Sequence, residues 1–493
     1  MTAQPLLPTG VTLAHPHELF IDGRWVGAAG GTIEVVSPDS EQIVATVAEG
    51  AGADMDAAVA AARRAFDQGP WPRTRPAERA RLLRLMAERL KAREAELARA
   101  WTAQIGGLAS FAPVMVGGGI AHFLNTAALA DSFLFEELVP PASVIAREPV
   151  GVVAAIAPWN APFAIMCAKV APALFAGCTV IMKPAPETPL EAYIIAEVAE
   201  EIGLPAGVLN LIPAHREASD HLVRNADVDK VSFTGSTTAG RRIASVCGDR
   251  IARCTLELGG KSAAILLDDY SIDAAAKLLT GAITTMSGQV CSILSRAIVP
   301  ATRHDELAEA IAREMKQVRV GYSDDPATQM GPLAMKRQLE RVEHYVAQGQ
   351  ADGAQMVAGG RRPAHLNRGY FIEPTLFAHV DNRLAIAQEE IFGPVLSLIP
   401  YEDAEDAVCL ANDSIYGLNG TVLTHDKDAA YRISRRVRTG GIGQNGLRGD
   451  INLPFGGFKQ SGIGRERGPE GLMSFLETKT IALEAPPSDL AVY

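Results

Sequence analysis

Short apolar runs alternate with stretches of helical periodicity through the middle of the chain. The predicted strands of this region are 152–157, 179–182, 208–212 and 230–233. Runs that stay apolar without alternating are typical of strands covered on both faces, as in parallel sheets. Helices of about 10–15 residues between such strands predict right-handed crossover connections. We therefore expect an α/β domain that binds its ligand at the carboxyl ends of the strands.

The N-terminal region has a different pattern. Residues 19–26 predict a β-hairpin around Asp22-Gly23, and two short strands are predicted between residues 32 and 47. Two amphipathic helices are predicted next, at 57–66 and 76–100, the first with Asp54 as its candidate N-cap. These elements precede the parallel sheet and are expected to pack around it.

A second α/β region follows the first one. It begins with a predicted strand at 262–267 and extends to about residue 445. A strand-like run at 479–483 lies near the C-terminus, and its open edge is suited to pairing with another subunit. At roughly 150 residues per domain, a chain of 493 residues is expected to contain about three domains.

Composition and charge narrow the class of protein. Apolar residues make up 48% of the chain and charged residues 21%, which is typical of a globular protein. The formal net charge is −11, so no basic surface indicates a nucleic-acid partner. We find no signal peptide and no apolar run near the roughly 20 residues that span a bilayer, which predicts a cytoplasmic protein without a membrane.

The metal-binding residue types do not form a recognisable pattern. The six cysteines contain no CxxC pair, and the ten histidines are scattered without an HExxH motif. The sequence therefore predicts reduced thiols and no metal centre.

One cysteine has neighbours that suit a nucleophile. Cys291 lies in Met-Ser-Gly-Gln-Val-Cys-Ser, where small and polar residues flank the thiol and Gly288 allows close backbone approach. A thiol becomes a strong nucleophile when a neighbour takes its proton or lowers its pKa. Taken alone, this cysteine is better explained as a buried residue that fills a gap in the core, which is what most free cysteines do.

Loops after the predicted strands of the first region carry further candidates. The Asn160 amide could stabilise a negative oxygen, or Asn160 could cap the helix that follows. Lys183 is suited to a ribose or phosphate, or it is an ordinary surface lysine. The turn from Gly235 to Gly240 leads into a helix N-terminus, which favours anions, although it lacks the GxGxxG fingerprint.

Carboxylates supply the remaining candidates. Glu257 lies inside an apolar run, so it needs an ion-pair partner or it has a raised pKa suited to general-base catalysis. Glu389 and Glu390 precede Phe392, and this combination could hold a ribose diol and a flat ring, or form a charged loop.

Four segments together resemble the aldehyde dehydrogenase superfamily. They are 256–261 (Leu-Glu-Leu-Gly-Gly-Lys), 288–291 (Gly-Gln-Val-Cys), 389–394 (Glu-Glu-Ile-Phe-Gly-Pro) and 454–462 (Pro-Phe-Gly-Gly-Phe-Lys-Gln-Ser-Gly). Their order and spacing also fit, and the match extends from about Leu19 to Thr480.

The resemblance implies a fold of three parts and an oligomer. It implies a Rossmann-like parallel-sheet NAD(P)-binding domain, an α/β catalytic domain and a small β bridging domain that joins subunits into a homodimer or homotetramer. The expected boundaries are 1–130 and 150–258 for the cofactor domain, 259–455 for the catalytic domain, and 131–149 and 475–493 for the bridging segments.

The resemblance also implies a mechanism. Cys291 would attack an aldehyde, and Asn160 and the Cys291 backbone N–H would hold the oxyanion. A hydride would pass to the nicotinamide and leave a thioester on Cys291. Glu257 would then activate water to release the acid, and Lys169 matches a lysine proposed to move protons for this glutamate.

The same resemblance implies a set of cofactor-binding residues. They are Ile156, Pro158, Trp159, Lys183, Gly235, Ser236, Gly240, Leu258, Glu390 and Phe392. Many members that prefer NAD carry an acid three residues after the ribose-binding lysine, where this chain has Pro186, with Glu187 one position later. We expect NAD as the cofactor and leave NADP as the alternative.

The substrate pocket implied by the resemblance is wide. Its residues are Ala161, Ala168, Val290, Ser292 and Phe455. The two alanines stand where members for small aliphatic aldehydes often have aromatic rings, so we expect a bulky, apolar aldehyde, aromatic or terpenoid. Alternatively, Arg448 binds the carboxylate of a semialdehyde, unless it simply pairs with Asp450.

Other functions remain open on the sequence alone. A CoA-acylating dehydrogenase would pass the thioester to CoA, but it usually lacks the glutamate base that Glu257 would supply. A structural or binding protein could keep the fold, although it would need none of Asn160, Glu257 and Cys291. Esterase activity would be a side reaction of the same thiol.

Overall fold

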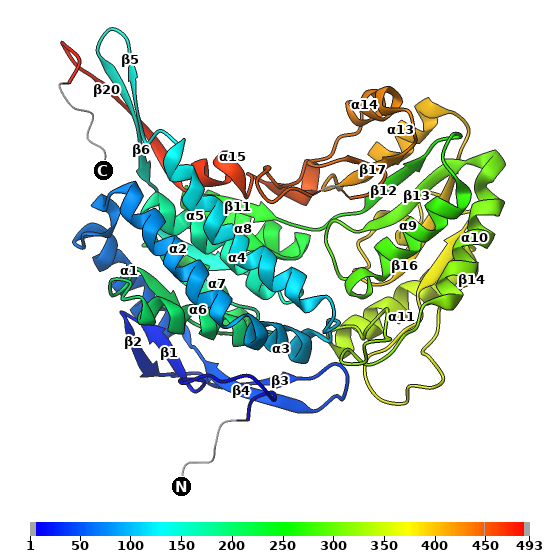
Figure 1. Ribbon diagram of the computed structural model, residues 1–493, viewed down its shortest axis with the longest axis horizontal. Helices are drawn as coiled ribbons and strands as arrows, with labels where there is room; N and C mark the ends of the chain where they lie inside the picture. The colour runs from blue at the N-terminus through cyan, green and yellow to red at the C-terminus, as the bar shows by residue number, and fades with distance from the viewer. Residues whose placement is uncertain (1–5, 448, 488–493) are drawn as a thin grey trace.

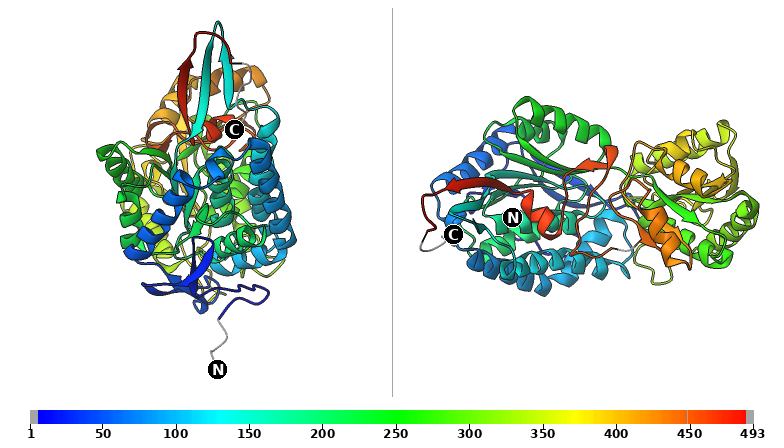
Figure 2. Two further views of the ribbon diagram at one scale, coloured as in Figure 1. Left: turned by 90° about the vertical axis from the view of Figure 1, so that its left-hand side faces the viewer. Right: turned by 90° about the horizontal axis from the view of Figure 1, so that it is seen from above.

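Two lobes and a projecting sheet make up the molecule (Figure 1). The computed structural model describes residues 6–447 and 449–487. Within them lie sheets of eight, seven, three and two strands. The eight-stranded and seven-stranded sheets form the centres of the two lobes, which lie side by side when the molecule is seen from above (Figure 2). This arrangement confirms the predicted α/β fold.

Five parallel strands form the middle of the eight-stranded sheet. They are β11 (Arg253–Glu257), β10 (Lys230–Thr234), β7 (Val152–Ile156), β8 (Thr179–Lys183) and β9 (Leu209–Leu211), in this spatial order. Every residue of β7, β8 and β10 is buried, as their unbroken apolar pattern predicts. The predicted hairpin, β1 (Glu18–Ile21) and β2 (Arg24–Gly27), extends one edge, and β19 (Gly462–Ile463) extends the other.

Helices cover both faces of this sheet. One face packs against α2 (Pro76–Ala92), α3 (Glu94–Ile105), α4 (Ala112–Ala128), α5 (Pro162–Ala176) and α6 (Leu190–Glu201). The other face packs against α1 (Gly52–Asp67), α7 (Arg216–Arg224) and α8 (Thr237–Asp249). Successive residues of β7 alternate between the two cores, since side chains point to opposite faces along a strand.

Several helix predictions need correction. The predicted helix 76–100 is two helices, because the chain leaves the helical conformation at Arg93. The N-cap of α1 is Ala51 and not Asp54, which instead occupies the third helical position and accepts a hydrogen bond from the Ala51 N–H at 2.8 Å. Helices α4 and α7 were not predicted.

Helix α4 also contradicts the expectation about apolar runs. By length and composition, Ala112–Asp131 is apolar enough to cross a membrane. However, it packs against α2, α3 and α5 in the first lobe, and its Val116, Ile120 and Phe123 are buried there. Core helices commonly pass the same test, so we interpret α4 as a core helix.

The seven-stranded sheet is parallel except at one edge. Its order is β14 (Gln355–Ala358), β15 (Thr375–Ala378), β16 (Val395–Tyr401), β13 (Leu294–Pro300), β12 (Ser262–Leu266), β17 (Gly420–Leu423) and β18 (Gly443–Gln444), with β14 antiparallel. The helices of this lobe are α9 (Ile272–Thr284), α10 (His304–Gln317), α11 (Lys336–Ala351), α12 (Ala385–Gln388), α13 (Ala404–Asn412) and α14 (Lys427–Ser434). The first of these strands along the chain, β12, begins at the residue predicted as the start of the second α/β region.

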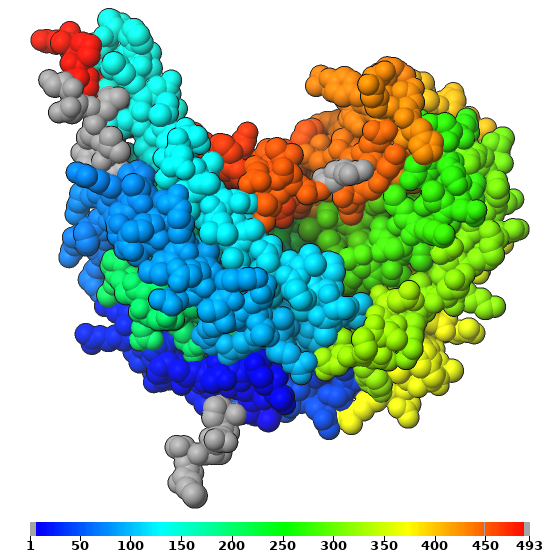
Figure 3. Space-filling model, viewed as in Figure 1, coloured from blue at the N-terminus to red at the C-terminus, as the bar shows by residue number. Residues whose placement is uncertain are grey.

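Segments far apart in sequence meet in the projecting sheet. β6 (Ser143–Pro149) lies between β5 (Glu136–Val139) and β20 (Leu476–Ala482), and all three are antiparallel. β20 begins and ends a little before the predicted run. This sheet stands clear of the surface (Figure 3), and most of β20 is exposed. A separate hairpin of β3 (Gly31–Val36) and β4 (Ile43–Glu49) packs on the first lobe, and α15 (Gly468–Met473) precedes β20.

Two neighbouring glycines of α4 allow a matched test of how α4 packs on α5. A Cβ on Gly119 would lie 2.3 Å from the ring of buried Phe163, whereas a Cβ on Gly118 would meet nothing within 4 Å. We expect Gly119→Ala to destabilise the protein by about 1–3 kcal/mol through overpacking. Gly118→Ala should stabilise it by about 0.5–1 kcal/mol through helix propensity. Urea unfolding of both variants measures this, and equal effects would contradict the packing.

Candidate functional site

A cleft of about 670 Å³ is lined by residues of both lobes. From the first lobe come loops that follow β7, β10 and β11, at the carboxyl ends of the parallel strands where we expect ligands. From the second lobe come Cys291, residues of α11 and the loop that holds Glu389, Glu390 and Phe392. Asn160, Ser236, Cys291 and Glu390, predicted on separate motifs, therefore line one cleft, whereas Lys183 and Glu257 are not among its lining residues.

The loop before Cys291 has an uncommon backbone conformation. It follows α9 through a short 3-10 turn, and φ is positive at Met286 (49°), Ser287 (56°) and Gly288 (74°). A Cβ on Gly288 would lie 2.2 Å from the Gly393 carbonyl oxygen, so only glycine fits there. Such a conformation persists only where its surroundings fix it. Gln289 contributes, since its Oε1 accepts a hydrogen bond from the Ala334 N–H at 2.9 Å.

Asn160 joins this loop to the first lobe. Its Nδ2 donates to the Gln289 carbonyl oxygen at 2.8 Å, and its side chain is buried. The alternative that Asn160 caps a helix is wrong, because the N-cap of α5 is Ala161. The amide therefore points toward the loop that carries Cys291, as an oxyanion donor requires.

The Cys291 thiol is protonated at neutral pH in the unliganded structure. Burial raises its pKa to about 12, and the neighbouring Glu390 and Glu257 add to the increase, while Arg467 opposes it. Attack by this sulfur therefore requires that its proton be removed at the site.

Glu257 is a buried carboxyl group without a partner. It ends β11 with an exposed fraction of 2%, and neither carboxyl oxygen has a hydrogen-bond partner among the described residues. Burial raises its pKa well above the ordinary value and Glu466 adds to this, while Lys169, Arg465 and Arg467 oppose it. The alternative of a salt-bridged structural glutamate does not fit these surroundings. A raised pKa is what a general base near neutral pH needs.

Lys169 lies beside this carboxyl group in a pair that the sequence did not predict. Its fully buried Nζ is 2.6 Å from Glu466 Oε1 and 3.3 Å from Ser232 Oγ. Glu466 lies between two arginines, a pattern that normally indicates a surface charge, so no local signal distinguishes it as a site residue. The pair lies close enough to Glu257 for both of its members to affect the pKa of that carboxyl group.

Seven of the ten predicted cofactor residues line the cleft. They are Pro158, Trp159, Gly235, Ser236, Leu258, Glu390 and Phe392. Ile156 and Gly240 are buried behind them, where a Cβ on Gly240 would collide with Leu258. Ser236 is the N-cap of α8, since its Oγ accepts a hydrogen bond from the Ala239 N–H, so the free N–H groups of α8 face the cleft region.

Burial shifts the pKa values of Lys183 and Glu390 in opposite directions. Lys183 ends β8 and is buried rather than on the surface, and burial lowers its pKa to about 8, with Glu187 opposing the decrease. Burial raises the pKa of Glu390 to about 7, although its Oε1 accepts a hydrogen bond from the Gly260 N–H at 3.0 Å. Phe392 and Trp159 contact edge to face, with ring centres 5.3 Å apart.

The residues predicted for a substrate pocket lie around Cys291 and α5. Ala161 and Ala168 are buried on or next to α5, and Val290 and Ser292 are half-buried. Phe455 exchanges two backbone hydrogen bonds of 2.8 Å with Glu466. Arg448 lies outside the described residues, so its predicted role has no structural description.

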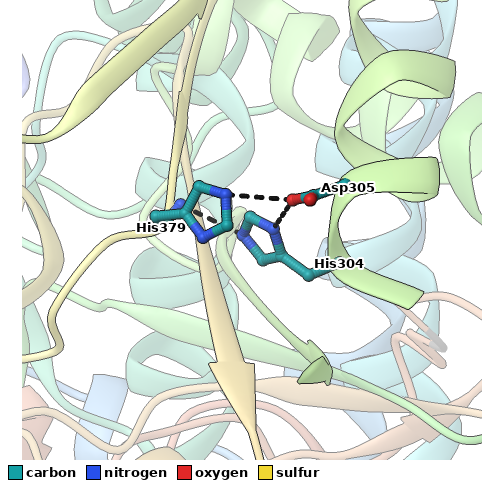
Figure 4. A group of neighbouring side chains, drawn as sticks. All are labelled: His304, Asp305 and His379. Atoms are coloured by element: carbon teal, nitrogen blue, oxygen red, sulfur yellow. Dashed lines mark hydrogen bonds and ion pairs between the residues drawn. The ribbon is translucent and has the colours of Figure 1, made fainter. Parts of the chain in front are cut away.

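A group of possible metal ligands lies elsewhere. His304, Asp305 and His379 come together where α10 begins and β15 ends, with ligand atoms within 4.8 Å of one another (Figure 4). The backbone N–H of His379 donates to His304 Nε2 at 3.0 Å, so Nε2 is an acceptor. In the neutral form of the His304 ring the proton is therefore on Nδ1, which faces Asp305. Because that nitrogen is a donor, hydrogen bonds explain the group and we assign no metal to it.

The chain resembles known proteins over almost its full length. A model of the aldehyde dehydrogenase family matches residues 25–481. Geranial dehydrogenase of Castellaniella defragrans is 43% identical over 96% of this chain and 100% of that protein. The 3-succinoylsemialdehyde-pyridine dehydrogenase of a Pseudomonas species is 41% identical over 94% of this chain and 98% of that protein.

Solved structures agree with these relatives. An aldehyde dehydrogenase of Mycobacterium tuberculosis in complex with NAD⁺ superimposes with a TM-score of 0.93 at 43% identity, covering 96% of this chain and 99% of that one. A mutant of aldehyde dehydrogenase C from Pseudomonas syringae, in complex with NAD⁺ and octanal, gives a TM-score of 0.94 at 38% identity over 97% and 99% of the two chains.

The protonation of Cys291 predicts how its alkylation depends on pH. Because the thiolate reacts and the pKa is raised to about 12, the rate should increase about tenfold per pH unit from pH 7 to pH 10. Iodoacetamide labelling of the protein without cofactor, read for each peptide by mass spectrometry, measures the rate at Cys291. Exposed Cys409 provides an internal control for accessibility. A plateau at Cys291 near pH 8 would show that its thiol ionises far more easily than this.

Burial of Glu257 predicts a pH-dependent effect of Glu257→Gln on stability. The folded protein holds the Glu257 proton above the ordinary pKa of 4.5, so unfolding releases it and wild type loses stability as pH rises through the raised pKa. The glutamine variant escapes this loss. We expect equal melting temperatures near pH 4.5 and a variant more stable by about 1–4 °C at pH 9, measured by differential scanning fluorimetry. A difference that shrinks with pH would mean that the native state favours the carboxylate.

Proposed function

Because the chain belongs to the aldehyde dehydrogenase family, we propose that it oxidises a bulky, apolar aldehyde to the carboxylic acid with NAD as the hydride acceptor. The observation that carries this proposal is that Asn160 and Cys291 line one interlobe cleft, and that the buried Glu257 carboxyl group is close enough to Cys291 to affect its pKa. A structural protein would gain nothing from a buried carboxyl group without a partner, since burying an unpaired polar group costs stability.

The proposed residues divide the reaction into two steps. The Cys291 sulfur attacks the aldehyde carbon after it loses its proton, while the Asn160 amide and the Cys291 backbone N–H hold the oxygen that becomes negative. When a hydride leaves the carbon, a thioester on Cys291 remains. Glu257 then takes a proton from water, which attacks the thioester and releases the acid and the free thiol. Lys169 and Glu466, which form a buried ion pair, would carry that proton away.

The cleft has suitable groups for a dinucleotide. The nicotinamide ring of NAD, bound beside Phe392, would supply the hydride acceptor. Glu390 would accept hydrogen bonds from its ribose, and the N-terminus of α8 at Ser236 suits the pyrophosphate. Lys183 would bind the adenosine ribose, and Glu187 beside it would repel the additional phosphate of NADP. Because Glu187 also pairs with Arg337, we expect only a modest preference for NAD.

Relatives support a bulky substrate. Geranial dehydrogenase is named for a terpenoid aldehyde, and small Ala161 and Ala168 leave space where rings would narrow the pocket. A second candidate is a semialdehyde, which the relative named for a pyridine semialdehyde favours. Arg448 would bind its carboxylate. An enzyme that acylates CoA is less favoured, because Glu257 is available to activate water.

We also propose that the protein forms a homodimer or homotetramer through the projecting sheet. Strand β20 offers an exposed edge, and residues 131–149 and 475–493 would form this bridging domain. The cofactor domain would comprise 1–130 and 150–258, and the catalytic domain 259–455.

A substrate panel tests the proposed reaction. We expect reduced nicotinamide to form without CoA, with kcat/KM for benzaldehyde or a terpenoid aldehyde about 10- to 100-fold above acetaldehyde because the larger body buries more apolar surface. NAD should exceed NADP by about tenfold, the effect of one partly screened charge.

Two variants test the proposed roles of Cys291 and Glu257. Cys291→Ala should abolish turnover, whereas Glu257→Gln should lower the steady-state rate by about 10²- to 10⁴-fold and keep an initial burst of reduced nicotinamide, because only the second step needs the base. Turnover that starts only when CoA is added would replace hydrolysis with acylation.

A further inference from the structure

Arg467 is a cation next to the reaction centre that the proposed reaction leaves without a role. It follows Glu466 directly, and its φ of 66° is uncommon for a residue with a side chain. Its guanidinium carbon lies 4.7 Å from the centre of the Phe455 ring. The position of this side chain is therefore fixed on two sides, by a constrained backbone and by an aromatic face.

The Arg467 guanidinium has unused hydrogen-bonding capacity. Its Nε is buried and has no hydrogen-bond partner among the described residues. No carboxylate of the described residues forms an ion pair with it, because the neighbouring Glu466 is occupied by Lys169. A half-buried cation with a free donor suits an acceptor that arrives with a ligand.

The positive charge of Arg467 affects the pKa values of residues on three different segments around the site. It opposes the raised pKa values of Cys291 and Glu257, and with burial it lowers the pKa of His122 on α4 to about 3. These residues come from a loop of the second lobe, from β11 and from α4. Arg467 therefore lies near the reaction centre and next to Phe455, and it is not among the residues that line the cofactor cleft.

We propose that Arg467 selects aldehydes that have an apolar body and an oxygen acceptor, a carboxylate or a carbonyl, at the end remote from the aldehyde. The body would lie along Phe455 while the guanidinium donates to the acceptor. This inference rests on the proposed function, because it assigns the substrate of that same site. A carboxylate should bind better than a carbonyl, since hydrogen bonds between two charged groups are the stronger ones.

Aldehydes with the same body test the assignment. We compare benzaldehyde, para-acetylbenzaldehyde and para-carboxybenzaldehyde, each with NAD, in wild type, Arg467→Met and Arg467→Lys. Straight-chain ω-oxo acids and the alkanals of equal length extend the test, because the distance between Arg467 and Cys291 selects the length that fits.

The expected result is a loss that depends on the acceptor. Arg467→Met should lower kcat/KM for the carboxylated aldehyde about 10- to 100-fold more than for benzaldehyde, mainly through KM, with the acetyl compound between them. Arg467→Lys should keep part of the preference. Arg465→Met is the matched control, because Arg465 also acts on Glu257 but donates to the Gly457 and Gly464 carbonyls. It should affect all three aldehydes equally.

Three outcomes would overturn the inference. Equal losses on all aldehydes in Arg467→Met would mean that Arg467 acts on the thiol or on the fold. A wild type that prefers no carboxylated or acetylated aldehyde, of any length, would exclude the assignment even if the variants fail to fold. An Arg467→Met variant that keeps the wild-type kcat/KM on every aldehyde would also exclude it. In contrast, a wild type that oxidises no aldehyde at all would refute the proposed function and not this assignment alone.

Discussion

Removal of water from ionisable groups at the junction of the two lobes is the constraint on which this site depends. Burial is the largest cause of the raised pKa values of Cys291, Glu257 and Glu390, and of the lowered value of Lys183. In water the two carboxyl groups and the lysine would be charged at neutral pH, and the thiol would have its ordinary pKa. Because each charged form is penalised inside, the thiol and the carboxyl groups can lie close together without strong repulsion.

Close packing of backbone around these groups excludes the water. A Cβ on Gly259 would lie 2.3 Å from Glu390 Oε2, and one on Gly456 would lie 2.7 Å from Glu257 Oε1. The hydrogen bond from Asn160 to Gln289 holds the Cys291 loop against the first lobe. Glycine is required at Gly456, where φ is 156° and the Gly464 carbonyl oxygen would also be too close, whereas a side chain on Gly259 would displace the Glu390 carboxylate.

The strands and helices that could be predicted are those with a clear local pattern of apolar and polar residues. The buried strands β7 to β10 and the helices α5 and α6 follow from apolar runs and periodicity, whereas α7 does not. Asn160 and Glu257 are candidates because they lie on a loop after a strand and in an apolar run, and Cys291 is a candidate because small and polar residues flank its thiol. The sequence could not indicate that Glu466 pairs with Lys169, 297 positions away, since nothing local distinguishes a paired acid from a solvated one. The break at Arg93 was missed for a related reason, because two helices that share an apolar face have one periodicity.

The charges around Glu257 differ in how far other groups of the protein neutralise them. Lys169, Arg465 and Arg467 act on this carboxyl group together with one other acid, Glu466. The Lys169–Glu466 pair is neutral as a unit, and Arg465 is bound to backbone carbonyls, so Arg467 is the cation most available to a new negative charge. In the proposed reaction Asn160 and the Cys291 backbone N–H hold the oxygen of the attacked aldehyde, so the carboxylate of a substrate would be this new charge. A fixed positive charge with no ion-pair partner among the described residues needs no reorganisation when that carboxylate binds, which is why it would stabilise the carboxylate more than mobile water does.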